Sequence, residues 1–256
     1  MNTNKWGPSG WNLLGTSAYK YDHVITRLPD HHKITLALIY KIHISNTETQ
    51  LPCKYCRESY TVYIRELPVD QPLIEHKLNN WMYLLHNKVN DKLRKQGYNT
   101  SEDPSLSEAT KMINLKSKNY YISTGWDYIN CIAHNYPEPA TARSKILAKV
   151  HFSTLPYLLP HPSLTSATVD FMNEYKLDEA LNDRNAFVTW IYLLHNNLLN
   201  VYKNIQPGFN PEEYTKSYEN TCSYYETFRA GCGMSKGKSG PSCRLPAPIA
   251  FKQVMG

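Results

Sequence analysis

Two cysteines separated by two residues, Cys53 and Cys56, are the residues of this 256-residue chain best suited to covalent chemistry. Thiols at this spacing can close a small, reducible disulfide. Pro52 and the unbroken segment up to Leu67 predict that the pair opens a helix. Amides at a helix N-terminus favour an anion, so the pKa of such a thiol is expected below its ordinary value of roughly 8.5. The pattern therefore predicts a redox-active pair.

The same pair also fits half of a zinc site. Zinc needs four ligands, and the chain contains no second CxxC and no HxxxH, although His76 and His86 are available as donors. Redox chemistry is therefore the preferred interpretation, and no metal is expected. A zinc-bound or non-enzymatic interaction module stays open as an alternative.

A second segment, Trp81 to Asn90, carries the groups that suit a bound cofactor. Apolar residues between positions 78 and 93 recur at steps of three and four, which predicts a helix with one apolar face. His86 and Asn90 lie four residues apart beside that face. Ring and amide donors on a helix near a CxxC pair suggest a disulfide that works against a bound redox cofactor.

These segments resemble the Erv/ALR family of FAD-dependent sulfhydryl oxidases. The resemblance rests on three motifs in order, which are Trp6-Gly7-Pro8-x-x-Trp11, Leu51-Pro52-Cys53-x-x-Cys56 and His86-Asn87-x-Val89-Asn90. It covers residues from about 5 to 115, and the opening motif is similar to the versions carried by large DNA viruses. The resemblance implies a small helical bundle that holds FAD, oxidises protein dithiols and reduces O2 to H2O2.

The resemblance also implies roles for single residues. Cys56 would be the sulfur next to the flavin, and Cys53 the sulfur that an incoming thiol attacks. The residues implied to hold FAD are Trp6, Gly7, Trp11, His86, Asn87, Val89, Asn90, Lys92 and Lys95. The chain departs from the family at Gly15, where a histidine is usual, and it lacks the family's further cysteines and tryptophan after the His-Asn motif. A flavin-free CxxC dithiol oxidoreductase is the other open alternative.

An internal repeat predicts the domain organisation. Residues 190–196 repeat residues 81–87 with a single change, and residues 125–136 echo residues 10–21. We therefore expect an FAD-binding domain over 1–118, a degenerate second copy over 119–206 and a flexible basic tail over 207–256.

The second copy has lost the groups that carry chemistry. Residues 161–165, which match the cysteine pair, contain no cysteine. The residues that match Val89, Asn90 and Lys92 are Leu198, Leu199 and Val201. We therefore expect one FAD per chain and a structural or interface role for the second copy.

The expected fold class is all-α, a four-helix bundle with a short fifth helix followed by the degenerate copy. Alternation at period two is scarce. The predicted helices cover residues 11–21, 32–45, 54–67, 74–96, 105–114, 126–135, 140–150, 165–175 and 184–204.

The remaining cysteines are interpreted by their surroundings. Cys131 lies in a predicted helix and is expected as a buried thiol. Cys222, Cys232 and Cys243 lie in a tail with Gly and Ser, where they either form a shuttle disulfide or stay incidental. The last 28 residues, from Arg229 onward, carry five basic residues and no acid in a chain of net charge +6, but no basic face with interleaved aromatics predicts specific nucleic-acid binding.

The start of the chain lacks the apolar core of a signal peptide, and no run of eighteen apolar residues occurs. A soluble protein without membrane contact is expected, in the host cytoplasm, virus factory or virion if the chain is viral. Reduced protein dithiols and O2 are the expected partners, and a homodimer is expected because small bundles of this family usually pair.

Overall fold

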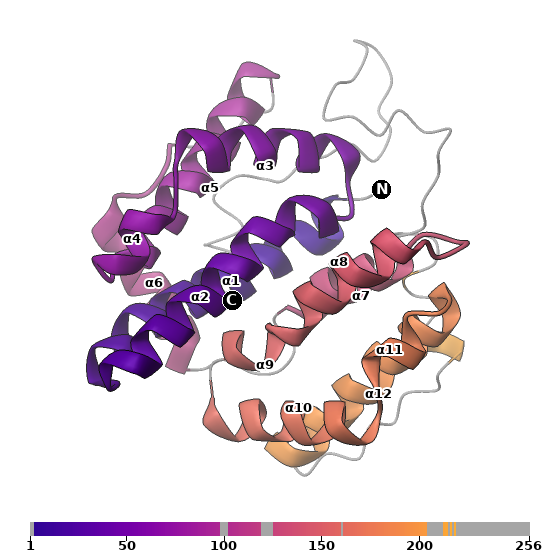
Figure 1. Ribbon diagram of the computed structural model, residues 1–256. Helices are drawn as coiled ribbons and strands as arrows, with labels where there is room; N and C mark the ends of the chain where they lie inside the picture. Colours follow the sequence, from indigo (N-terminus) through magenta and orange to yellow (C-terminus); the bar gives the residue numbers. More distant parts are fainter. Residues whose placement is uncertain are drawn as a thin grey trace.

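The computed structural model describes residues 3–97, 102–118, 125–159 and 161–203, together with residues 212–214, 216 and 218. Every regular element in this part of the chain is a helix, which confirms the all-α fold class (Figure 1). Within the same residues, no helix is long and apolar enough to cross a membrane.

The helices fall into two consecutive sets. The first set is α1 (Thr3–Val24), the 3-10 helix η1 (Ile25–Arg27), α2 (Asp30–Gln50), α3 (Lys54–Glu66), α4 (Asp70–Ile74), α5 (Leu78–Lys95) and α6 (Leu106–Lys118). The second set is α7 (Trp126–His134), α8 (Ala142–Ser153), α9 (Leu155–Leu158), α10 (Pro162–Glu174), α11 (Leu177–Ala180) and α12 (Arg184–Lys203). The short helices α4, α9 and α11 were not predicted as separate elements.

The first helix begins earlier than predicted. α1 starts at Thr3 rather than at residue 11 and continues through Pro8. A proline inside a helix removes one backbone hydrogen bond and is costly. Packing offsets this cost, because the ring of Trp6 is buried against that of Tyr128 on α7, with the ring centroids 6.0 Å apart.

The helix predicted over residues 74–96 begins later, at Leu78, and the short helix α4 ends at Ile74 before it. His76 has a positive φ of 57°, a left-handed conformation that ends α4 and redirects the chain. α5 then begins at Leu78, and its first N–H groups are capped from another helix. The carboxylate of Asp22 on α1 accepts hydrogen bonds from the backbone N–H of Leu78 and Asn79, at 2.8 and 2.9 Å. This cap fixes the start of α5 on α1.

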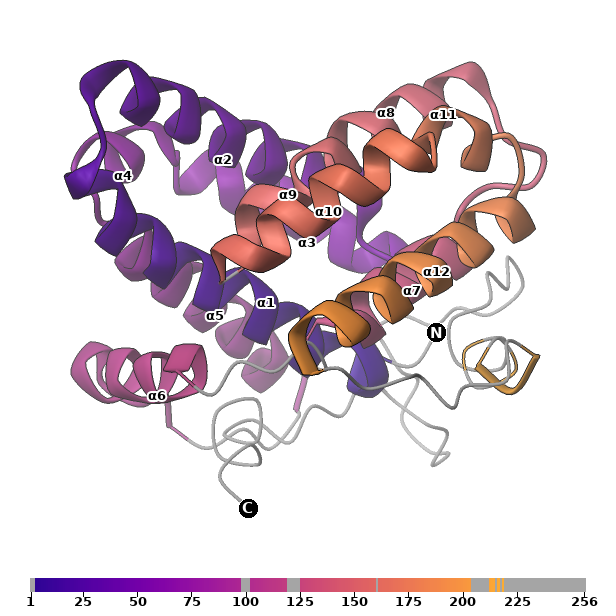
Figure 2. The ribbon, with the colours of Figure 1, turned by 90° about the horizontal axis from the view of Figure 1, so that it is seen from below.

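The two sets of helices pack through corresponding members, α1 against α7 and α2 against α8. Figure 2 shows the first set, from indigo to magenta, forming one arm and the second set, from pink to orange, forming the other. The rings of His43 on α2 and His151 on α8 stack with centroids 4.2 Å apart. Asn46 on α2 donates a hydrogen bond to the carbonyl of Leu147 on α8 at 2.6 Å.

Contacts inside the first set recur inside the second. The donors of the hydrogen bonds correspond in the sequence repeat, Trp81 to Trp190 and Tyr21 to Tyr136, and in the ring pairs both residues correspond. The pairs are Trp81 Nε1 to Leu67 O and Trp190 Nε1 to Tyr175 O, Tyr21 OH to Leu73 O and Tyr136 OH to Leu181 O, and the ring pairs Trp11–His86 and Trp126–His195. The backbone frame thus repeats along with the sequence.

Part of the segment assigned to a flexible tail packs on the core. Tyr214 and Tyr218 are buried. The Tyr214 hydroxyl accepts a 2.6 Å hydrogen bond from Asn130 on α7, and Tyr218 donates one of 2.7 Å to Asp127. The described residues of this segment therefore belong with the second set of helices.

Cys131 was expected to be a buried thiol, and this was wrong because it is disulfide-bonded. It lies fully buried on α7, and its position in an apolar helix gave no sign of a covalent partner. Cys222, Cys232 and Cys243 lie outside the described residues.

Candidate active site: a cavity beside Cys56

The cysteine pair opens α3 as predicted. Cys53 is the N-cap residue, with extended backbone angles of φ −129° and ψ 122°, and α3 runs on from Lys54. The carbonyl of Cys53 accepts the first helical hydrogen bond, from the backbone N–H of Arg57 at 2.9 Å. Cys56 therefore lies in the first turn of α3, on the helix end that favours negative charge.

Both cysteines are present as thiols, and their surroundings differ. Cys53 exposes only 5% of its surface, whereas Cys56 is partly exposed and faces a cavity. Cys53 has no side-chain cap bond to α3 within the described residues. The N–H groups of the first turn are therefore available to stabilise a thiolate.

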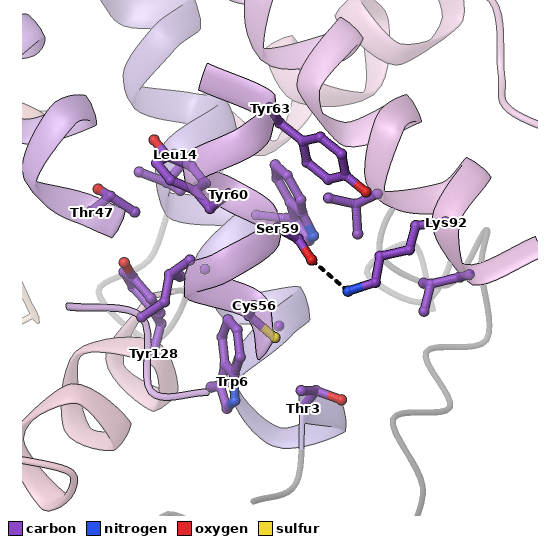
Figure 3. Close-up of a pocket in the computed structure, with 16 residues that line it drawn as sticks. Thr3, Trp6, Leu14, Thr47, Cys56, Ser59, Tyr60, Tyr63, Lys92 and Tyr128 are labelled. Atoms are coloured by element: carbon purple, nitrogen blue, oxygen red, sulfur yellow. Dashed lines mark hydrogen bonds between the residues drawn. The ribbon is translucent and has the colours of Figure 1, made fainter. Parts of the chain in front are cut away.

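The cavity beside Cys56 lies between α1, α3, α5 and α7 (Figure 3). It encloses about 810 Å³ not filled by protein, with its open mouth included. Its lining is mostly aromatic and aliphatic. The lining residues are Thr3, Trp6, Gly7, Gly10, Trp11, Leu14, Thr47, Leu51, Cys56, Ser59, Tyr60, Tyr63, Val89, Lys92, Leu93 and Tyr128.

Five of the residues expected to hold FAD line this cavity together with Cys56. They are Trp6, Gly7, Trp11, Val89 and Lys92. Lys92 on α5 donates a 2.6 Å hydrogen bond to the hydroxyl of Ser59 on α3, which bridges two walls of the cavity (Figure 3). The lysine adds the positive charge that this largely apolar lining otherwise lacks.

His86 lies behind the cavity wall. Its ring meets that of Trp11 edge-on, with centroids 4.5 Å apart and an interplanar angle of 79°. Burial lowers the pKa of His86 to about 4, so the ring is neutral at pH 7. His86 also lines a smaller neighbouring cavity that includes Gly15 and Ile113. Its direct effect is on the position of Trp11.

The absence of a side chain at Gly15 is compensated by α6. A Cβ atom placed on Gly15 would lie 3.5 Å from Cδ1 of Ile113, which is an ordinary van der Waals contact. α6 packs against α1 at this point. Ile113 thus closes the side of the bundle at which the family usually carries a histidine.

Asn90 does not line the cavity and instead bonds to Asp103, in the segment before α6. Its Nδ2 donates to Asp103 at 2.6 Å, and Arg94 donates to the other Asp103 oxygen at 2.7 Å. Burial alone would raise the pKa of Asp103, but the hydrogen bonds from Arg94 and Asn90 outweigh it and leave the pKa below its usual range. The network ties the segment before α6 to α5.

Asn87 and Lys95 lie outside the cavity lining. The side-chain oxygen of Asn87 is buried and accepts no hydrogen bond from the described residues. Lys95 is the exposed last residue of α5. The structure therefore places five of the predicted cofactor residues in the cavity lining and leaves Asn87 and Lys95 outside it.

Tyr128 is one of the lining residues that the sequence motifs missed. It comes from α7, in the half of the chain that has no cysteine pair, and its ring packs over Gly10 on α1. A Cβ atom on Gly10 would come within 3.2 Å of that ring, tighter than nearly all ordinary contacts. Glycine at position 10 therefore admits Tyr128, and α7 completes the wall of the cavity.

The cavity fits the chemistry of FAD. Its aromatic side chains offer flat apolar surfaces to a fused ring system. The indole N–H of Trp6 is buried and finds no acceptor among the described residues, so it is available to an acceptor atom of a bound molecule. Lys92 supplies a cation for an anionic group. Within the described ranges, no group of three His, Cys, Asp or Glu side chains is placed to hold a metal ion.

Residues 8–111 match the Erv1 / Alr family. The chain is 37% identical over 93 residues to the mitochondrial FAD-linked sulfhydryl oxidase ERV1 of Saccharomyces cerevisiae, which covers 35% of this chain and 43% of the yeast protein. The chain thus spans less than half the length of that relative. No solved structure matches the chain.

Proposed function

We propose that this chain is an FAD-linked sulfhydryl oxidase. Its residues 8–111 match the Erv1 / Alr family. It forms disulfides in protein dithiols and passes the electrons to O2, which becomes H2O2. One observation carries the proposal, namely that Cys56 faces an aromatic cavity while its partner Cys53 stands at the N-cap of the same helix.

The dithiol step uses the Cys53–Cys56 pair in its disulfide form. A substrate thiolate attacks Sγ of Cys53, the bond between Cys53 and Cys56 breaks, and Cys56 leaves as a thiolate in the cavity. The second substrate thiolate then attacks the substrate sulfur of the mixed disulfide and releases Cys53 as a thiolate. The substrate departs as a disulfide, and its two electrons remain on the cysteine pair.

The protein groups around Cys56 favour this leaving group. The N–H groups of the first turn of α3 stabilise negative charge on its sulfur. When bound, FAD would supply the two-electron acceptor and the reaction with O2. Trp6, Trp11 and Tyr128 would hold it by ring contacts, with Lys92 as the cation of the site. His86 stays neutral and keeps the ring of Trp11 in place.

In the second half, aromatic rings pack at the place that matches the Trp11–His86 contact. Trp126 stacks flat on His195, with ring centroids 4.2 Å apart and an interplanar angle of 16°. The hydroxyl of Tyr214 lies 3.1 Å from Nδ1 of His195 and packs among the same rings. We infer that this half is a degenerate copy that supports the first, contributes Tyr128 to its cavity and holds no flavin of its own.

The proposal is tested by turnover. Dithiothreitol and a reduced protein should each be oxidised with one O2 consumed and one H2O2 formed per disulfide. A colourless protein that exchanges thiols with glutathione but consumes no O2 would instead identify a flavin-free oxidoreductase. A protein that holds zinc and shows neither reaction would identify an interaction module.

A relay through the tail cysteines extends the proposal. Truncation after Gln206 is a poor test, because it also removes the buried Tyr214 and Tyr218. Serine substitution of Cys232 and Cys243 keeps both tyrosines in the chain. If these cysteines relay electrons, the variant oxidises reduced proteins more slowly and dithiothreitol at the wild-type rate. Equal rates for both substrates would leave the tail without a role in electron transfer.

A further inference from the structure

A second, larger and more polar groove lies next to the cysteine turn, where Leu51 and Arg57 line it. It encloses about 1730 Å³ with its open space included. Its walls come from the end of α2, the start of α3, α7, the α7–α8 connection, the first half of α8 and the first residue of α12. Leu51 lines both this groove and the cavity beside Cys56, so one residue separates the two.

The groove reaches the turn that carries Cys53. Arg57, one helical turn after Cys53, lines it and donates a 2.5 Å hydrogen bond to the carbonyl of Leu51, two residues before Cys53. Cys53 itself is almost covered, with 5% of its surface exposed. A substrate thiol therefore needs to be placed accurately beside it, and the groove is the adjoining surface that can do so.

The charge of the groove is unbalanced. Three arginines line it, Arg57, Arg143 and Arg184, against the single acid Glu138. None of the four makes an ion pair within the described part of the chain. Arg184 donates one hydrogen bond, of 2.6 Å, to the carbonyl of Tyr136. Guanidinium groups in this setting favour carboxylates, which they can bind through two parallel hydrogen bonds.

We propose that this groove docks an extended acidic segment of the substrate protein, next to the dithiol that Cys53 oxidises. The inference rests on the proposed function for its biological meaning, and the binding it predicts is measurable without turnover. Polar side chains along the walls, among them Gln50, Thr141 and Ser144, add hydrogen-bonding groups for a peptide backbone.

The chain's own C-terminal tail is a poor occupant of this groove. From Arg229 onward the tail has five basic residues and no acid, so its charge has the same sign as that of the groove. Like charges facing each other cost free energy. An acidic partner has the complementary charge, and attraction at this range raises the rate of encounter at low salt.

Binding is tested first, with two fluorescent peptides of equal length in which serines replace the two cysteines. One peptide carries aspartates around the serines and the other carries lysines. The full-length wild-type protein should bind the aspartate peptide at least about tenfold more tightly, and the preference should weaken as salt shortens the Debye length from about 10 Å at 0.1 M. Equal affinities for both peptides would overturn the proposal.

Charge reversal locates the binding. Arg143→Glu should abolish the preference, since Arg143 is exposed and lines the groove. Arg65→Glu is the matched control, because Arg65 is exposed near the other end of α3 and lies outside the groove lining. A preference that survives Arg143→Glu, or that Arg65→Glu removes equally, would contradict docking in this groove. Melting curves of both variants verify that they are folded.

Turnover separates this inference from the function on which it rests. Dithiol versions of the two peptides and dithiothreitol are compared in the same preparation. Loss of the acidic-peptide preference with dithiothreitol still oxidised sinks the groove proposal alone. Oxidation of none of the three would sink the oxidase proposal, while the binding result would still decide the groove.

Discussion

His43 of α2 and His151 of α8 stack face to face at the contact between the two halves, with ring centroids 4.2 Å apart and an interplanar angle of 26°. Nδ1 of His43 lies 2.8 Å from the hydroxyl of Thr154. Burial lowers the pKa of His43 to about 4, and burial together with His43 lowers the pKa of His151 well below its usual value. Both rings are therefore neutral in the folded protein at pH 7.

This pair makes the fold sensitive to acid. The folded pKa lies below the unfolded value of roughly 6.5, so the unfolded chain binds more protons as the pH falls. The stabilisation is complete above pH 6.5 and is lost progressively towards pH 4. For His43 alone the loss between pH 7.5 and pH 5 is about 2 kcal/mol. Melting temperatures across this range should fall, and less steeply for His43→Leu than for the exposed control His31→Gln. Identical pH slopes in the two variants would contradict this assignment.

The cysteine pair is tested by single substitutions. Cys53→Ser and Cys56→Ser should each lower the oxidation of dithiothreitol by at least about a thousandfold, because neither variant can form the disulfide that accepts electrons. Bound flavin should remain, since the aromatic walls are unchanged. Tyr55→Phe, between the two cysteines, is the control for local disturbance and should stay within a few-fold of wild type. Either serine variant turning over at a comparable rate would remove the pair from the mechanism.

Flavin stoichiometry distinguishes the two halves. We expect one FAD per chain, because the first half combines the Cys53–Cys56 pair with an aromatic cavity, whereas Trp126 stacks flat on His195 in the second half. Trp11→Phe should weaken flavin binding about tenfold, through loss of ring contact and of the edge-on packing with His86. The matched change Trp126→Phe, in the second half, should leave flavin content per folded chain unchanged. Extraction that yields two flavins per chain would mean that the second half is a functional site.

Tyr128 tests whether the second half completes the cavity. Tyr128→Ala should weaken flavin binding about tenfold or more, because it opens the wall that packs over Gly10. Tyr128→Phe keeps the ring and should bind flavin nearly as wild type. Flavin content and melting temperature measured together distinguish a lost contact from lost folding. If Tyr128→Ala retains full flavin content, the cavity belongs to the first half alone.

The expected homodimer remains a prediction, for which α2 offers a surface. Ile34 and Leu38 lie one turn apart on this helix and are 72% and 55% exposed. Light scattering should give twice the 29.6 kDa chain mass, and the double change Ile34→Glu with Leu38→Glu should reduce it to one chain. A concentration-independent mass of a single wild-type chain would show that the second half has taken the place of a partner subunit.

The sequence predicted the features that depend on local patterns. The start of α3 at the cysteine pair followed from Pro52 and the uninterrupted segment after it, and the face of α5 followed from its apolar spacing. Local patterns also predicted that α5 would start at residue 74, and this was wrong because His76 adopts a left-handed conformation that side-chain type alone does not reveal. Pro8 was similarly misleading, since the burial of Trp6 against Tyr128 outweighs the local cost of proline.

The parts of the site that depend on long-range contacts could not be predicted from the sequence. Tyr128 reaches the cavity from a helix more than a hundred residues after α1, and no motif marks it. The disulfide at Cys131 gave no local signal either. The internal repeat was visible as matching letters, but only the structure shows α1 packed on α7 and α2 on α8. Chain topology brings these residues together, and spacing along the sequence does not encode it.

The FAD-linked oxidase function is tested most directly by the visible spectrum of the purified wild-type chain. The spectrum is recorded without oxygen, before and after dithiothreitol is added. An FAD-linked sulfhydryl oxidase should show the absorption band of oxidised flavin at one equivalent per chain, its loss on adding the dithiol, and its return when air is admitted. A protein without that band after supply of FAD, or a band that the dithiol leaves unchanged, would contradict this function.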